Sequence, residues 1–230
     1  MSGRLEFGVN LNNREPLIAP DYDLGMLLDL SEVVEERGFD SVWVGDSLFS
    51  KPRYEPIALL AAISQRTSQV KLGTACMVSS TRNPLYLALE WATLDQISGG
   101  RTILGTGMGN PEELAEQLDL IRAYADEEGA DFERLVISYQ VTMNVGDSED
   151  EARAAFRDYI SKYYPELSKA MDLSNWGPVG TPDQIADWIR TFADAGVDHF
   201  ICRFGAIDQF DQVERFAGEV LPRFVPERVR

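Results

Sequence analysis

The feature of this 230-residue sequence that most constrains its fold is a regular alternation between short β-type runs and helical patterns. Six runs rich in β-forming residues are predicted to be strands, at 5–11, 41–44, 70–77, 102–104, 135–145 and 197–202. Helical patterns lie between them, with helix-start signals at Asp23, Pro56, Pro84 and Pro182. Strands that alternate with helices pair in parallel through right-handed crossovers. The sequence therefore predicts an α/β protein, either a (β/α) barrel or an open doubly wound sheet.

The alternation continues along the whole chain. Helices are expected from about 148 to 171 and from 182 to 195, with an irregular loop, NWGPVG, between them. No linker, low-complexity tract or further repeat divides the chain. Because the strands do not alternate between apolar and polar residues, both faces of the sheet are expected to be buried. Residues 1–230 are predicted to form one domain.

The charge of the chain argues against two classes of partner. Asp and Glu number 38 and Lys and Arg 21, so the net charge is −17. Such a charge repels the phosphates of nucleic acids and anionic lipid surfaces. No apolar run is long enough to cross a membrane, and the N-terminus lacks the apolar core of a signal peptide. We therefore expect a cytoplasmic protein that binds neither nucleic acid nor membrane.

Cysteine and histidine are too scarce for several kinds of site. Cys76, Cys202 and His199 are the only such residues, so a disulfide framework and an ordinary zinc site are excluded, and no metal is expected. His199 lies inside a predicted strand, where a hydrogen-bonded sheet residue is the simpler interpretation. Cys76 is interpreted in the same way, as a small buried residue and not a reactive thiol.

Polar or small residues follow several predicted strands, at the position where barrel enzymes bind their ligands. Asp46 and Ser47 follow the strand 41–44, and they indicate either a pocket or a simple turn. Gly105 and Gly107, in GTGMGN, lack the G-x-G-x-x-G spacing of a dinucleotide loop. Their spacing favours a close approach of a ligand or of neighbouring backbone.

Two further positions have both a structural and a functional interpretation. Gly180, Thr181 and Pro182 have the pattern of a helix start, and an exposed helix start near the last strands of a barrel also binds phosphate. Gly180 and Thr181 are therefore included among the predicted cofactor-binding residues. Arg82 and Arg101 flank one predicted helix and could hold an anion, although Arg101, in SGGR before a strand, is more typical of a loop anchor.

Four segments, in this order, resemble the bacterial luciferase-like, flavin-dependent oxidoreductases. They are GFDSVWVGDSLF (38–49), KLGTACMVSSTRNP (71–84), ATLDQISGGRTILGTGMG (92–109) and VGTPDQIADWI (179–189). The resemblance covers nearly the whole chain and implies a (β/α)₈ barrel that binds FMN, or the related deazaflavin coenzyme F420, at its C-terminal mouth. It implies a monooxygenase that uses reduced FMN and oxygen on a small organic substrate. The alternatives are a deazaflavin-dependent hydride-transfer enzyme and a non-catalytic flavin-binding protein. The implied partners are a flavin reductase and a second copy of the chain in a homodimer.

The resemblance also implies roles for individual residues. Ala75 and Cys76 match the position where many members carry a cis peptide bond against the flavin ring. Asn10 would end the first strand beneath the ring or the substrate, and Asp46 matches the acidic residue after the second strand. Gly105, like Gly107, would leave clearance for the ring at the fourth strand.

Ser47 is the predicted catalytic residue and departs from the family pattern. Many relatives have histidine at this position, and that histidine is tied to catalysis. A serine hydroxyl can donate a hydrogen bond to a flavin or a peroxide, but it is too weakly acidic to act as a base near neutral pH. The histidine-assisted step of those relatives is therefore not expected here.

The chain is shorter than the resemblance requires. In the family, the fourth strand is followed by a helix, a fifth strand with a phosphate-binding turn, another helix and a sixth strand. Here GTGMGN continues directly into PEELAEQLDLIRAYADEEG, which resembles the helix after the sixth strand, and the join falls at about 109–112. Three explanations stay open: the sequence omits an internal stretch, the gene carries a natural deletion, or the protein is a cofactor-free remnant.

Overall fold

One parallel sheet organises the molecule. The computed structural model describes residues 4–17, 19, 21–47, 52–78, 82–105, 138–164, 177–194 and 197–225. Within them, seven strands pair in parallel in the order β4-β3-β2-β1-β7-β5-β6. They are β1 (Glu6–Leu11), β2 (Ser41–Val44), β3 (Lys71–Thr74), β4 (Thr102–Ile103), β5 (Ser138–Val145), β6 (Val179–Gly180) and β7 (His199–Phe204). The predicted α/β class is therefore confirmed.

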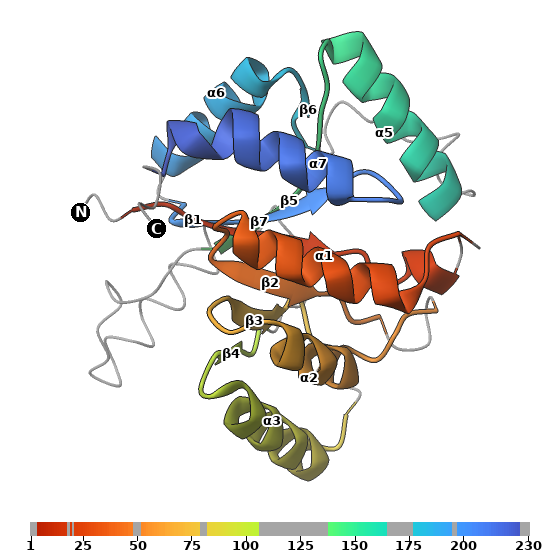
Figure 1. Cartoon of the computed structure of the whole chain (residues 1–230), viewed down its shortest axis with the longest axis vertical. Coiled ribbons are helices and arrows are strands. Elements are labelled where there is room, and N and C mark those ends of the chain that lie inside the picture. The colour runs from red at the N-terminus through yellow and green to blue at the C-terminus, as the bar shows by residue number, and fades with distance from the viewer. Residues whose placement is uncertain are drawn as a thin grey trace.

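The helices cover one face of the sheet, with one exception. They are α1 (Leu24–Glu36), α2 (Pro56–Arg66), α3 (Pro84–Ser98), α5 (Glu149–Tyr163), α6 (Pro182–Asp194) and α7 (Phe210–Arg215). Figure 1 shows α3, α2, α1, α7 and α6 in a row along the sheet, and α5 apart from this row beside the carboxyl ends of the strands. None of the described helices is long and apolar enough to span a membrane.

The structure corrects several predicted element boundaries. The segment expected to be an irregular loop contains β6, whose two residues pair with Asn144 and Val145, so seven strands are found instead of six. A pairing this short leaves no periodic signal in the sequence. The strand predicted over 70–77 ends at Thr74, because the chain turns at the next residue. The helix predicted to reach 171 ends at Tyr163, and 165–176 lie outside the described residues.

The two faces of the sheet differ in polarity. Side chains that point toward the helices are apolar and fully or almost fully buried: Phe7, Val9, Leu11, Val42, Val44, Leu72, Met143, Val145, Phe200, Cys202 and Phe204. The alternate positions point to the inner face of the sheet and include polar residues along its whole height. Two of them, Ser138 and Gln140, are exposed. The expectation of two buried faces therefore fails at the start of β5. There β6 pairs only with the last two residues of β5, and no other described strand lies along that edge.

Trp43 fills the inner face between β1 and β3. Its indole Nε1 donates to Ser41 Oγ at 2.7 Å, and the side chain is 3% exposed. A Cβ atom added at Gly73 would lie 2.3 Å from the indole, and one added at Gly8 would lie 2.6 Å from it. These two glycines therefore leave the space that the indole occupies, which is the close approach that a glycine inside a strand often indicates.

We expect Gly73→Ala to lower the free energy of unfolding by ~1–3 kcal/mol, because the added methyl overpacks a buried indole. Gly218→Ala is the matched control, since a Cβ there meets nothing within 4 Å. The control should leave stability unchanged or raise it by up to ~1 kcal/mol. Urea denaturation of both variants measures the difference, and equal stabilities would contradict this packing of Trp43.

Candidate functional site

Residues that follow β2 and β3 meet at the carboxyl edge of the sheet. The Asp46 carboxylate accepts hydrogen bonds from the Val78 amide at 3.0 Å and from Nη2 of Arg82 at 3.1 Å. Its side chain is 2% exposed, so the ion pair is shielded from solvent. Arg82 also lies 3.1 Å from a carboxylate oxygen of Glu55. Asp46 therefore links the end of β2 to the segment after β3 and to the start of α3.

The segment that Asp46 holds contains the predicted cis peptide bond. The bond between Ala75 and Cys76 is cis, as the resemblance implies. The next residue, Met77, donates its amide to the carbonyl oxygen of Gly105 at 2.7 Å, which joins this segment to the end of β4. Four predicted cofactor-binding residues are thus brought together at one edge, although their contact with a cofactor stays a prediction.

Ser47 belongs to a second group of residues. Its Oγ accepts a hydrogen bond from Nε of Arg53 at 2.8 Å. Arg53 also donates to Oδ1 of Asn13 at 2.9 Å and to the hydroxyl of Tyr163 at 2.7 Å. The predicted catalytic serine is therefore positioned by an arginine, and its catalytic role stays a prediction.

A buried ion pair lies beside this second group, between the ends of β1 and β7 and helix α5. Glu15 is fully buried, and its Oε1 accepts a hydrogen bond from the Tyr159 hydroxyl at 3.0 Å. Nη2 of Arg203 donates to the same hydroxyl at 2.6 Å and lies 3.7 Å from Oε1 of Glu15. Nε of Arg203 donates to Oδ1 of Asn12 at 3.1 Å. These contacts fasten α5 over the carboxyl ends of β1 and β7.

Burial sets the protonation of these groups. Burial raises the pKa of Glu15, and the nearby Arg203 guanidinium only partly opposes this effect. Burial also raises the pKa of Tyr159 well above its usual value. For Arg203, burial lowers the pKa, but the hydroxyls of Tyr159 and Tyr163 and the carboxylate of Glu15 raise it overall. Arg203 is therefore a permanently charged guanidinium in a largely buried position.

The sequence analysis did not predict the buried ion pair of Glu15 and Arg203 or the tyrosines beside it. Arg203 lies at the carboxyl end of the strand that contains His199, and it is a polar residue at a strand end in the same sense as Asp46. That signal alone could have identified Arg203. The partners Glu15, Tyr159 and Tyr163 could not be found in this way, because they come from a 3-10 turn and from a helix.

Asn10 lies on the inner face of the sheet and not at its edge. It is 5% exposed and one residue before the end of β1. With its amide oriented to meet its neighbours, its oxygen accepts from Nε2 of Gln140 at 2.8 Å and its nitrogen donates to the carbonyl of Trp43 at 3.3 Å. The contact spans β7, which lies between β1 and β5, so Asn10 and Gln140 meet on the inner face of the sheet.

Gly180 and Thr181 lie at the carboxyl end of β6, at the opposite end of the strand order from β4, and no described contact joins them to the residues around Asp46. Their contact with a cofactor stays a prediction. The Thr181 amide donates to Oε1 of Gln184 at 2.9 Å, and the Gln184 amide donates back to the Thr181 hydroxyl at 3.4 Å. This reciprocal pair is a capping box, so Thr181 has the predicted helix-cap role. Gly107 lies outside the described residues.

Two structural interpretations made from the sequence, those of Arg101 and His199, are confirmed. Arg101 anchors a loop: it donates to the carbonyls of Ser98 (2.8 Å), Val70 (2.8 Å), Ser64 (3.0 Å) and Thr67 (3.0 Å). His199 is a buried sheet residue, with Nε2 3.0 Å from Ser41 Oγ and Nδ1 3.1 Å from Ser138 Oγ. No group of three His, Cys, Asp or Glu side chains is placed to hold a metal ion in the described part of the chain.

The buried imidazole predicts a specific pH dependence of stability. Burial lowers the pKa of His199, so the folded protein favours the neutral ring. The contribution of His199 to the free energy of unfolding should be fully present above the unfolded pKa of ~6.5. Below that pH it should fall by up to ~1.4 kcal/mol per pH unit. His199→Gln should lose this component. Urea unfolding of both proteins between pH 7.5 and 5.5 measures it, and their difference isolates His199, because the raised pKa of Glu15 acts with the opposite sign in both. A difference that does not change with pH would contradict the assignment.

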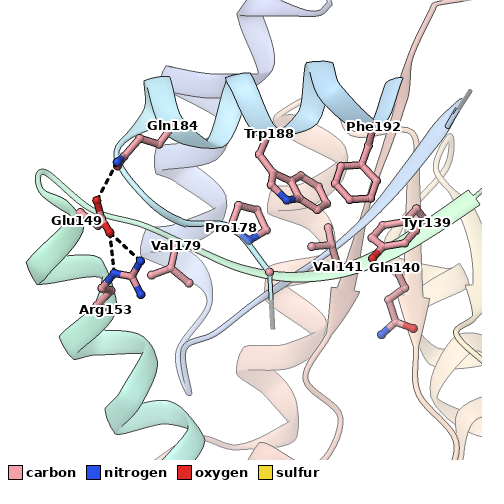
Figure 2. Close-up of a pocket in the computed structure, with 11 residues that line it drawn as sticks. Tyr139, Gln140, Val141, Glu149, Arg153, Pro178, Val179, Gln184, Trp188 and Phe192 are labelled. Carbon is pink, nitrogen blue, oxygen red and sulfur yellow. Dashed lines mark hydrogen bonds and ion pairs between the residues drawn. The ribbon is translucent and has the colours of Figure 1, made fainter. Parts of the chain in front are cut away.

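A cavity of about 480 Å³ lies between the strands β5 and β6 and the helices α5 and α6. Figure 2 shows it beside β5, between Tyr139, Trp188 and Phe192 at one end and Glu149, Arg153 and Gln184 at the other. The rings of Trp188 and Phe192 stack with centroids 4.0 Å apart. None of the predicted cofactor-binding residues lines it. The cavity follows the uncovered edge of β5 and is separate from the residues gathered by Asp46.

Solved structures and curated proteins show what the chain resembles. It matches the structure of monooxygenase RslO1 from Streptomyces bottropensis with a TM-score of 0.78 and 18% identity, over 96% of this chain and 100% of that one. The oxygenating constituent of 3,6-diketocamphane monooxygenase of Pseudomonas putida, in complex with FMN, matches with a TM-score of 0.68 and 16% identity, over 97% of this chain and 100% of that one. These likenesses confirm the barrel-type fold.

The sequence also has curated relatives. It is 28% identical over 190 residues to the F420-dependent glucose-6-phosphate dehydrogenase of Amycolatopsis mediterranei, covering 78% of this chain and 53% of that protein. The chain spans about half, or less, of the length of the curated relatives it matches. A family model described as luciferase-like monooxygenase matches residues 5–113 and 106–199. The chain therefore belongs to the luciferase-like monooxygenase family.

Proposed function

We propose that this chain is a flavin-type oxidoreductase whose cofactor binds at the carboxyl edge of the sheet. The observation that carries the proposal is the meeting of Asp46, Ala75, Cys76 and Gly105 at one edge of the barrel-type sheet, where enzymes of this architecture bind their ligands. Family membership supports the same assignment.

The residues at this edge fit a flat ring. Ala75 and Cys76 are only partly buried, so backbone and small side chains form the surface that a ring would contact. The missing side chain of Gly105 makes room for the Thr74 carbonyl, 2.1 Å from where a Cβ would lie. Asp46 is engaged with Arg82 and the Val78 amide, so its role would be to hold this surface in place. A bound flavin would supply the redox chemistry.

The leading form of the proposal is an FMN-dependent monooxygenase. A flavin reductase would supply reduced FMN, and the substrate would be a small organic molecule. Ser47, fixed by Arg53, would orient a ligand through a hydrogen bond and would not act as a base. Likeness to monooxygenase structures supports this form.

The second form is hydride transfer with deazaflavin coenzyme F420. The observation in its favour is the relation to an F420-dependent dehydrogenase over 78% of this chain. The two forms share the same edge of the sheet, and they differ in the need for oxygen.

Cofactor retention tests the proposal. The protein should be incubated separately with FMN and with F420, freed of unbound ligand, and examined by absorbance. One of the two chromophores should be retained in near-stoichiometric amount and should be reduced and reoxidised with substrate turnover. Retention without turnover would favour the non-catalytic flavin-binding alternative. Retention of neither would contradict all three versions.

We also propose that βα units of the family barrel are missing from this sequence at the join. The family model matches in two pieces that meet at 106–113, which supports a gap near the join predicted at 109–112. This join lies outside the described residues. Intact-mass measurement of the natural protein separates an omitted stretch from the other two explanations: a much heavier chain would restore the missing βα units, and a mass near 25.7 kDa means a natural deletion or a cofactor-free remnant. Cofactor retention then separates these two.

We further propose a homodimer that forms through α3. Leu85 and Leu89 on this helix are 80% and 65% exposed, and Tyr86 is 67% exposed. Analytical ultracentrifugation of the wild type and of Leu85→Glu/Leu89→Glu should show a dimer that becomes a monomer. A monomeric wild type would contradict the proposal. The cytoplasmic location and the lack of a nucleic-acid partner stay predictions based on charge.

A further inference from the structure

Three guanidinium groups from different parts of the chain converge on one tyrosine. The Arg203 guanidinium lies over the ring of Tyr163, 4.3 Å from its centroid, and that of Arg14 lies 4.7 Å from the same centroid. Arg53 donates to the hydroxyl of this tyrosine at 2.7 Å. Arg14 follows β1, Arg53 follows β2 and Arg203 ends β7, so the three meet at the carboxyl edge beneath α5.

Among the described residues, the positive charge of this group exceeds the negative charge that faces it. The carboxylate paired with the group in the described part of the chain is Glu15, at 3.7 Å from Arg203. Three guanidinium groups and one carboxylate have a net charge of +2. Arg14 and Arg53 donate to neutral oxygens, including the carbonyl and hydroxyl oxygens of Tyr163. This excess lies in a chain whose net charge is −17.

One donor of the group is buried and lacks a partner. Nε of Arg14 is inaccessible to solvent and makes no hydrogen bond within the described residues. A purely structural role, in which the three arginines hold their loops to Tyr163, would require hydrogen-bond donors but no excess positive charge. Bringing like charges together in a partly buried place is unfavourable unless an opposite charge joins them.

We propose that Arg14, Arg53 and Arg203 form a subsite for an oxyanion, a phosphate or carboxylate group, at the carboxyl edge of the sheet. Guanidinium groups match the geometry of such anions through paired N–H donors, and the aromatic ring of Tyr163 keeps two of them stacked in place. The anion belongs either to the cofactor or to the substrate. The subsite rests on the arrangement of charge and not on the proposed flavin reaction.

Arg14 is the best residue for a test, because the one described hydrogen bond of its side chain is to the Tyr163 carbonyl. Inorganic phosphate should be titrated by calorimetry at low ionic strength into the wild type, Arg14→Gln, Arg14→Lys and Arg53→Lys. Arg153→Gln is the matched control, because Arg153 lies on the same helix as Tyr163 but pairs with Glu149 at the separate cavity beside β5. Far-ultraviolet circular dichroism confirms that each variant is folded.

Arg14→Gln should weaken phosphate binding ~10-fold or more, which corresponds to ~1.4 kcal/mol. Arg14→Lys and Arg53→Lys should weaken it less, since both keep the charge but lose the paired donors. Arg153→Gln should bind as the wild type does. Absence of phosphate binding in the wild type, or equal binding by wild type and Arg14→Gln, would overturn the proposal.

Comparison of FMN with riboflavin identifies the source of the anion, since the two differ only in the phosphate. If FMN binds more tightly and Arg14→Gln removes the advantage, the subsite holds the cofactor phosphate. If FMN and riboflavin bind equally while phosphate binding depends on Arg14, it holds a substrate oxyanion. Both results support the subsite. If neither flavin binds, F420 is not retained either, and phosphate binding still depends on Arg14, the proposed function fails and the subsite stands.

Discussion

Arg203→Met is expected to lower the free energy of unfolding by ~3–5 kcal/mol, because it leaves the buried carboxylate of Glu15 without a counter-charge. Arg203 also supports Tyr159 and Asn12 by direct hydrogen bonds. The pKa of Glu15 is already raised by burial, and loss of the guanidinium would raise it further. The defect should therefore shrink as the pH falls and Glu15 takes up a proton in the folded state.

A double-variant cycle separates the buried charge from lost packing. Glu15→Gln/Arg203→Met should recover much of the stability that Arg203→Met loses, since removing both charges of a buried pair is often close to neutral. Urea denaturation at pH 7.5 and 5.5 measures all four proteins. A loss below ~1 kcal/mol for the single variant, or no recovery in the double variant, would show that the ion pair does not hold the end of β7 to α5.

Arg101→Met should cost a similar ~3–5 kcal/mol, for a different reason. Arg101 precedes β4 and donates to backbone carbonyls at the end of α2 and before β3, including Ser64 and Val70. Methionine keeps much of the side-chain volume but leaves several partly buried carbonyls without donors. The expected result is loss of the contact between the α2–β3 connection and β4.

Arg101→Lys separates charge from geometry. One ammonium group cannot reach all the acceptors that the planar guanidinium serves, so this variant should lose about half as much stability as Arg101→Met. Chemical denaturation checks both values, and hydrogen exchange should show faster opening of β3 and β4 in either variant. A fully stable Arg101→Met protein would contradict the anchoring role.

The fold could be predicted from the sequence wherever the signal was local. The alternation of strands and helices identified six of the strands, and the SGGR segment identified the loop anchor at Arg101. The sequence did not reveal β6, because a two-residue strand has no periodicity, and its pairing with β5 is a tertiary contact. It also did not reveal that the inner face of β5 is partly open, since this depends on which strands lie beside it.

The candidate site could be predicted only in part, for a related physical reason. Asp46, Ala75 and Gly105 each follow a strand, so parallel pairing brings them to one edge. Glu15 and Arg203 are 188 positions apart in the chain, and nothing in either local sequence indicates that they form an ion pair. The convergence of three arginines on Tyr163 likewise depends on where α5 lies, which no local pattern predicts.

Protection of Cys76 from alkylation by bound cofactor tests the central claim most directly. Cys76 and Cys202 are the only cysteines. The prediction that Cys76 is buried is wrong, because its side chain is partly exposed where the chain leaves β3. Cys202 is fully buried, and burial raises the pKa of its thiol. Maleimide should therefore modify Cys76 alone in the folded protein, with Cys76→Ser as the unmodified control. Saturation with the retained flavin should slow this reaction several-fold, as followed by intact mass. An unchanged rate at saturating flavin would place the cofactor elsewhere and contradict binding at the carboxyl edge.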